Sequence, residues 1–190
     1  MKKITPEQYR NMPWKNGAGT TIEMAIFPEH ASLHDFDWRV SRAAVPEDGS
    51  FSHFDGIDRS LALLDGPGMR LKVNDVLHQV DAVNNIAVFA GEAATHAELI
   101  DGPITDFNLM SRRGLCTHQL SHWAGQATRA LPKECALLYC AKGSGTLVTD
   151  QGNIELLEDE TMLFGAAAEV TPLILHTNPG SRFYCVQIFR

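Results

Sequence analysis

The chain has 190 residues, 44% of them apolar, so it can bury the core of one large or two small domains without disulfides. Its formal charge of −7 and its lack of basic runs give little attraction to phosphate backbones or anionic lipids, so we expect neither nucleic-acid nor membrane partners. No apolar leader follows the first lysines and no apolar run is long enough to span a bilayer, which predicts a cytoplasmic protein.

The first predicted element is one short N-terminal helix, with Thr5 as cap, Pro6 at the first helical position and Gln8 three residues after the cap. Short apolar or alternating segments follow at 20–27, 38–45, 60–64, 69–73, 86–89 and 104–110. The second half of the chain shows the same pattern, with candidate strands at 136–141, 146–149, 154–157, 161–164, 173–176 and 183–189. Many short strands between glycine turns predict an all-β sandwich or barrel.

The two halves also match each other in sequence. The turn Gly66-Pro67-Gly68 matches Gly143-Ser144-Gly145, and 107–110 matches 186–189 when the halves are superposed. This pattern indicates a degenerate duplication. We therefore expect two successive lobes, 1–112 and 113–190.

Polar residues gather in the first lobe, beginning with the segment 14–23. Trp14, Asn16 and Glu23 bring an aromatic ring, an amide and a carboxylate to the start of the strand at 20–27. On the next strand Arg39 and Ser41 share one face. An inward and an outward Arg39 fit the alternation equally well, so its orientation stays open.

An arginine also stands just ahead of the apolar strand at 60–64. Arg59 can reach the mouth of a barrel, where its planar fork suits bidentate recognition of a carboxylate, and Phe51 can supply an apolar wall. The alternative is a surface pair of Arg59 with Asp55 or Asp58.

The last strand of the first lobe alternates so that Asp106 and Asn108 share a face. The matching strand of the second lobe offers only Gln187 as a comparable polar group. We therefore expect the site in the first lobe, and a second lobe that is structural or forms an interface.

A metal site is not expected. The chain has no H-x-H pair, and its histidine pairs His30/His34 and His118/His122 lie in predicted polar connections. No phosphate-binding loop follows Gly17-Ala18-Gly19 either. No cofactor is predicted.

The ordered segments W-K-N-G-A-G-T-T-I-E, W-R-V-S, F-x-G-I-D-R and D-F-N-L-M-S-R resemble the HutD/Ves family of bacterial bicupins. The resemblance implies two cupin-like lobes and, for the histidine-utilisation members, a regulatory link through an intermediate such as N-formylglutamate. It carries over Asn16, Glu23, Arg39, Ser41, Arg59 and Asn108. Two positions depart from the family pattern: Ala18 interrupts a triple glycine, and Asp55 stands where proline often precedes glycine.

The leading hypothesis is a metal-free protein that binds a small anionic metabolite, with Arg59 on its carboxylate and Asn16 and Asn108 as neutral partners. The first alternative is a small-acid isomerase or lyase with Glu23 or Asp106 as general base. The second is a homodimeric scaffold whose pocket is vestigial.

Overall fold

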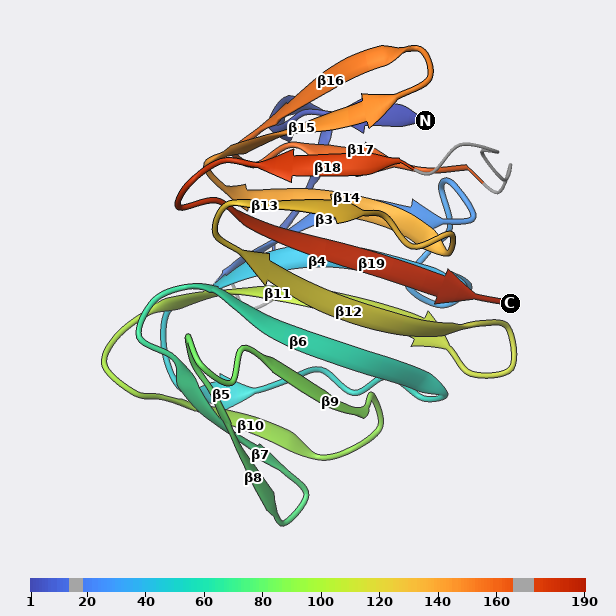
Figure 1. Ribbon diagram of the computed structural model, residues 1–190. Helices are drawn as coiled ribbons and strands as arrows, with labels where there is room; N and C mark the ends of the chain where they lie inside the picture. Colours follow the sequence, from blue (N-terminus) through green and yellow to red (C-terminus); the bar gives the residue numbers. More distant parts are fainter. Residues whose placement is uncertain (14–18, 166–172) are drawn as a thin grey trace. The chain divides into compact units, whose positions relative to one another are not determined.

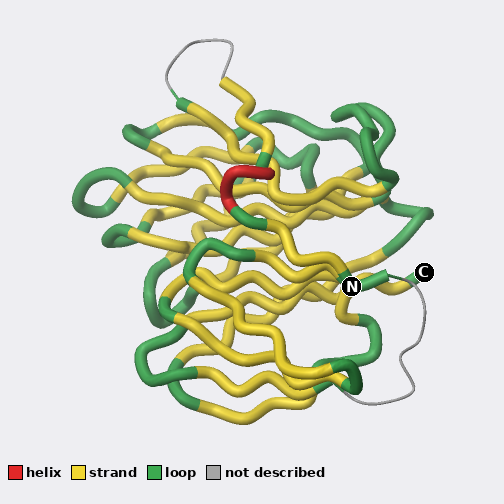
Figure 2. The backbone as a smooth tube through the Cα atoms, turned by 90° about the horizontal axis from the view of Figure 1, so that it is seen from above, coloured by secondary structure: helices red, strands yellow, loops and turns green. Residues whose placement is uncertain are grey.

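The computed structural model describes residues 1–13, 19–165 and 173–190, and strands dominate these segments (Figures 1 and 2). Their one helical element is the 3-10 turn η1 (Pro6–Gln8). Its cap forms as predicted, because the Thr5 amide donates to the Gln8 side-chain oxygen at 2.9 Å and the Gln8 amide donates to the Thr5 carbonyl at 3.0 Å. None of the described helices is long and apolar enough to cross a membrane.

The chain forms two compact units. Residues 9–117 and Arg190 make up the first unit, and residues 118–189 with residues 1–8 make up the second. The first residues belong with the second unit because β1 (Lys2–Ile4) pairs antiparallel with β17 (Thr161–Leu163).

The first unit consists of two sheets with a core between them. The six-stranded sheet has the order β2 (Arg10–Pro13), β3 (Thr20–Phe27), β4 (Trp38–Val45), β11 (Ile104–Arg112), β6 (Ile57–Asp65), β9 (Ile86–Ala90). The four-stranded sheet has the order β5 (Gly49–Ser50), β10 (Thr95–Leu99), β7 (Met69–Val73), β8 (Val76–Val80). Leu61 and Leu63 of β6 pack in one cluster with Met69 and Leu71 of β7, so these inner faces form a shared apolar core.

The second unit repeats this plan. Its five-stranded sheet has the order β1, β17, β14 (Cys135–Lys142), β19 (Arg182–Phe189), β12 (Thr117–Ala124). Its four-stranded sheet has the order β13 (Ala127–Ala130), β18 (Ile174–Thr177), β15 (Ser144–Thr149), β16 (Gly152–Leu157). The core between these sheets includes Leu138, Leu147, Met162 and Leu175. The fold is therefore mainly β with two cupin-like lobes, each built as paired sheets.

The strand pairing defines how the two units correspond. Asp106 pairs with Leu63 as Phe183 pairs with Cys140, on the equivalent strands of the two units. Asn108 likewise pairs with Leu61 as Cys185 pairs with Leu138. The sequence match, which set Asn108 against Gln187, is thus displaced by two residues along β19.

The matched glycine turns have the same physical basis in both units. Gly66 and Gly143 have φ values of +99° and +73°, in the region that side chains rarely adopt. A Cβ at Gly66 would lie 2.6 Å from the Pro103 carbonyl oxygen, and one at Gly143 would lie 2.7 Å from the Ser181 hydroxyl. Both turns therefore require glycine.

Several strands escaped the sequence prediction because they are polar or short. β8 and β12 form sheet edges, and β12 reads Thr-His-Gln-Leu-Ser-His-Trp-Ala with no fully buried residue. His118 and His122 lie on this strand, so their assignment to a connecting segment was wrong. Edge strands face water on much of their surface, which weakens the apolar alternation that reveals a strand.

Candidate functional site

The predicted polar residues of β3, β4, β6 and β11 share one face of the six-stranded sheet. Glu23 pairs with Ser41, and Ser41 pairs in turn with Asn108. In the neighbouring row Met110 pairs with both Arg39 and Arg59. Directly paired residues project to the same side of a sheet, so these side chains lie on the same face as the core residues Leu61 and Leu63 of β6. We call this face of the six-stranded sheet the inner face.

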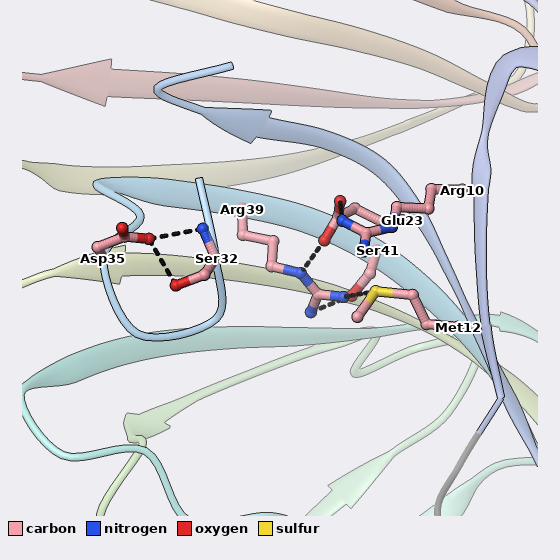
Figure 3. Close-up of polar contacts among 7 residues, drawn as sticks. All are labelled: Arg10, Met12, Glu23, Ser32, Asp35, Arg39 and Ser41. Carbon is pink, nitrogen blue, oxygen red and sulfur yellow. Dashed lines mark hydrogen bonds and ion pairs between the residues drawn. The ribbon is translucent and has the colours of Figure 1, made fainter. Parts of the chain in front are cut away.

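Arg39 points inward and is fully engaged by its neighbours (Figure 3). Its Nε donates to Glu23 Oε2 at 2.7 Å and its Nη1 donates to Ser41 Oγ at 3.3 Å. Its Nη2 contacts the Met12 sulfur at 3.4 Å. Arg39 and Glu23 are 4% and 6% exposed, so this is a buried ion pair, and the outward orientation is excluded.

Arg59 is more deeply buried, at 2% exposure, and three phenyl rings surround its guanidinium. The centroids of Phe51, Phe54 and Phe89 lie 5.2, 5.8 and 5.1 Å from the guanidinium carbon. Nη1 donates to the Ser52 carbonyl at 3.2 Å. Within the described residues, the buried Nε has no acceptor.

The surface alternative for Arg59 is wrong, because Arg59 is buried and both acidic residues proposed for it contact other side chains. Asp55 contacts His53 at 2.8 Å, and Asp58 lies 3.3 Å from Arg113 Nε. Burial lowers the pKa of Arg59 to about 10, with nearby Arg39 adding to this effect and Asp106 opposing it. The guanidinium therefore stays charged at neutral pH.

Asp106 of β11 is an acidic neighbour of Arg59. It is 2% exposed, and burial raises its pKa to about 7 against the opposing effects of Arg59 and of a backbone hydrogen bond. That bond comes from the Ala43 amide, which donates to Asp106 Oδ1 at 3.1 Å. At neutral pH a substantial share of Asp106 is therefore neutral, and Arg59 lacks a full counter-charge.

Asn108 is the β11 member of the paired row that also contains Glu23 and Ser41. Its side chain is 8% exposed, and in the part of the chain that the structure describes its Oδ1 is buried with no donor. A buried unpaired oxygen costs about 1–3 kcal/mol, so this arrangement leaves an acceptor available inside the unit.

Two predicted site residues, Trp14 and Asn16, lie outside the described residues. Three contributors escaped the sequence analysis: Met12 beside Arg39, and Phe54 and Phe89 around Arg59. The closely spaced aromatics ahead of Arg59 could have pointed to Phe54. Phe89 had no local signal, because it reaches Arg59 by pairing across β6 and β9.

The described residues include no group of three or more His, Cys, Asp or Glu side chains placed to hold a metal ion. The desolvated guanidinium of Arg59 is the group on this face that can attract an anion. Beside it lie the carboxyl group of Asp106, whose pKa burial raises to about 7, and the amide oxygen of Asn108, which accepts hydrogen bonds and has no donor among the described residues.

The model of the HutD family matches residues 6–178 of the chain. An uncharacterised 21.2 kDa protein in the hutC 3′ region of Pseudomonas putida is 36% identical over 110 residues, covering 58% of this chain and 57% of that protein. Protein Ves of Cronobacter sakazakii is 38% identical over 108 residues, covering 56% and 58%. The aligned stretch thus spans little more than half of each relative.

Solved structures show the same fold over the whole chain. A conserved protein of unknown function from Pseudomonas aeruginosa PAO1 is 27% identical, with a TM-score of 0.89 and coverage of 100% of this chain and 98% of that one. A cupin 2 conserved barrel domain protein from Leptotrichia buccalis is 9% identical, with a TM-score of 0.56 and coverage of 99% and 95%. The latter likeness concerns the fold alone.

Proposed function

Because the chain belongs to the HutD family, we propose that its first unit binds a small carboxylate metabolite without a metal and serves to sense or regulate histidine utilisation. A hut-region relative and the family name support the pathway. An intermediate such as N-formylglutamate would suit the charge of the site.

The observation that carries the proposal is the unsatisfied guanidinium of Arg59. A buried arginine without a full counter-charge is costly, and Glu23 is already paired with Arg39 at 2.7 Å. A ligand carboxylate at Arg59 would accept from Nε and balance the charge. The surrounding phenyl rings keep water away, which strengthens the ionic interaction.

Roles follow for the other residues. The Glu23–Arg39 pair positions Ser41 and holds the polar side of the face in place. Phe51 forms an apolar wall beside Arg59. Asp106 adjusts its protonation to the charge of the bound molecule.

One observation favours an enzyme as the second candidate. The raised pKa of Asp106, about 7, suits a general acid or base at neutral pH. In this candidate Asp106 moves a proton on a small acid whose carboxylate Arg59 holds, as in an isomerase or lyase. Glu23 is less available for this role, because its carboxylate is already paired with Arg39 and also lies 3.9 Å from Arg10 Nη1.

A thermal-shift titration with N-formylglutamate, urocanate, glutamate and divalent metals tests the proposal. One acid should raise the melting temperature of the wild type, and the shift should vanish in Arg59→Ala and weaken in Arg59→Lys, which keeps the charge but loses the fork. Arg70→Ala, an exposed arginine of the same unit, is the matched control and should keep the shift.

Other outcomes separate the alternatives. Consumption of the bound acid, abolished in Asp106→Asn, would favour the isomerase or lyase. A shift with metals alone would refute metal-free binding. If no acid shifts the protein and Arg59→Ala changes only its stability, the scaffold with a vestigial pocket is the better account, and sedimentation would then test for the homodimer.

A further inference from the structure

The inner face of the first unit leaves two polar atoms of opposite kind without partners. Arg59 Nε is a donor and Asn108 Oδ1 is an acceptor, and both are buried with no hydrogen bond to any described residue. The side chains are 2% and 8% exposed, so bulk water does not satisfy them. An occupant of this face must therefore supply both an acceptor and a donor.

The strand register places the two residues close together. Asn108 of β11 pairs with Leu61 of β6, and Arg59 lies two positions before Leu61 on the same side of the strand. Such diagonal neighbours have backbones roughly 7–8 Å apart. The two side chains thus project from neighbouring positions on one face of the sheet.

The residues paired with Asn108 on the two neighbouring strands do not supply a donor for its Oδ1. Ser41, on β4, forms no hydrogen bond to Asn108 Oδ1 among the described residues, and Leu61, on β6, is apolar. The inner residues of the facing sheet include Leu71, Val73 and Ala97, which offer no side-chain donor. The donor that Asn108 needs must come from outside the described residues.

We propose that the ligand is a carboxylic acid that carries a hydroxyl or an amide N–H, with its carboxylate on Arg59 and its donor on Asn108. This inference rests on the proposed function and adds the chemical class of the ligand. A plain carboxylate would satisfy Arg59 and leave Asn108 unpaired. A second carboxylate at Asn108 would set acceptor against acceptor.

Two pairs of probes test this class by calorimetric titration at pH 7. N-acetylglycine and N-acetyl-N-methylglycine differ by the amide N–H, and lactate and propionate differ by the hydroxyl. In the wild type the donor-bearing member of at least one pair should bind on the order of 10-fold more tightly, because the analogue leaves a buried acceptor unpaired. Using both pairs separates the lost donor from the added bulk of the N-methyl group.

Variants locate the effect. Asn108→Leu keeps the branched shape of the side chain and should remove the preference for the donor-bearing acid within each pair. Asn178→Leu in the second unit should keep this preference. Asn178 is an exposed asparagine whose side-chain amide donates to the Ser144 hydroxyl at 2.8 Å. Arg59→Ala should weaken the binding of all four acids to a similar extent.

The results for the two proposals are distinguishable. Equal affinity within both wild-type pairs, with binding still lost in Arg59→Ala, overturns the donor requirement and leaves the carboxylate site standing. A preference that persists in Asn108→Leu also overturns it. Failure of all four probes and of the pathway acids to bind the wild type overturns the carboxylate site as well. The wild-type comparison is decisive even if Asn108→Leu does not fold.

Discussion

The two units share the order of their central strands but fill their interiors differently. On equivalent strands, the first unit has Asp106 and Asn108 where the second has Phe183 and Cys185. The core cluster of the second unit consists of apolar residues and cysteines. Two substitutions on one strand, together with the arginines of β4 and β6, thus separate a polar interior from an apolar one on the same scaffold.

Three buried polar residues of the second unit have partners nearby. The Thr177 hydroxyl donates to the Gly125 carbonyl at 2.7 Å, and the Ser181 hydroxyl donates to the Ser144 carbonyl at 2.7 Å. Glu160 forms an ion pair with Lys3 at 2.6 Å. Among the described residues, buried atoms without partners occur in both units: Arg59 Nε and Asn108 Oδ1 in the first, and His122 Nε2 and Arg182 Nε in the second. The units differ in depth, because Arg59 and Asn108 are buried residues whereas His122 and Arg182 are half-buried. This difference fits a first interior that accepts a ligand at some cost in stability.

The largest expected effect comes from breaking the buried pair of the first unit. Arg39→Met leaves Glu23 buried without its partner and should lower the free energy of unfolding by about 3–5 kcal/mol, measured by urea denaturation. The double variant Glu23→Leu/Arg39→Met should recover most of the loss, since no charge is then stranded. A single variant as stable as Arg70→Ala would contradict the structural role of this pair.

The next effect is a pH dependence that the second unit should not share. Burial raises the pKa of Asp106 from 3.8 to about 7, so between these values the folded state holds a proton that the unfolded state releases. This group therefore makes the protein less stable as pH rises through that window, by up to about 1.4 kcal/mol per pH unit.

Urea denaturation at several pH values would measure this slope. Asp106→Asn keeps an oxygen for the Ala43 amide and should remove the contribution of Asp106. The difference between wild type and variant cancels the other titrating groups. A difference that does not change between pH 4 and pH 7 would show that Asp106 titrates normally.

A smaller effect is expected from placing the polar residue of the first unit into the second. Cys185→Asn sets an amide among apolar side chains and should cost about 2 kcal/mol by denaturation. Cys185→Ala is the control, because it removes the sulfur without adding a polar group. If the asparagine costs no more than the alanine, the second interior tolerates polarity and the contrast between units is weaker than proposed.

The smallest effect is expected from placing an apolar residue at Asn108 in the first unit. Without ligand, Asn108→Leu should raise the free energy of unfolding by about 1 kcal/mol, because it removes an unpaired buried oxygen. The same variant should lose the ligand preference described above. A clear loss of stability would mean that Asn108 has a partner in the protein.

The sequence predicted the features that depend on local pattern. Alternation on 104–110 placed Asp106 and Asn108 on one face, and Thr5, Pro6 and Gln8 predicted the helical turn at 6–8. The glycine turns at 66–68 and 143–145 indicated the repeated lobes. Resemblance of the ordered motifs identified the family.

The register between strands was decided only in three dimensions. Alternation says which residues of a strand share a face, but it leaves open which strand lies alongside and which face is covered. Arg39 is one example, since either orientation fitted its strand until Glu23, sixteen positions earlier, was found beside it.

Arg59 shows the same limit at the site itself. The sequence made it an anchor candidate with Phe51 and Phe54 close by in the same segment, but Phe89 joins them only when β6 and β9 pair. The sequence by itself therefore determined the more apolar strands, the repeat and the polar character of the first lobe. Tertiary structure decided the partners of each charge and which polar atoms stay unpaired, because burial and desolvation arise from contacts between residues distant along the chain.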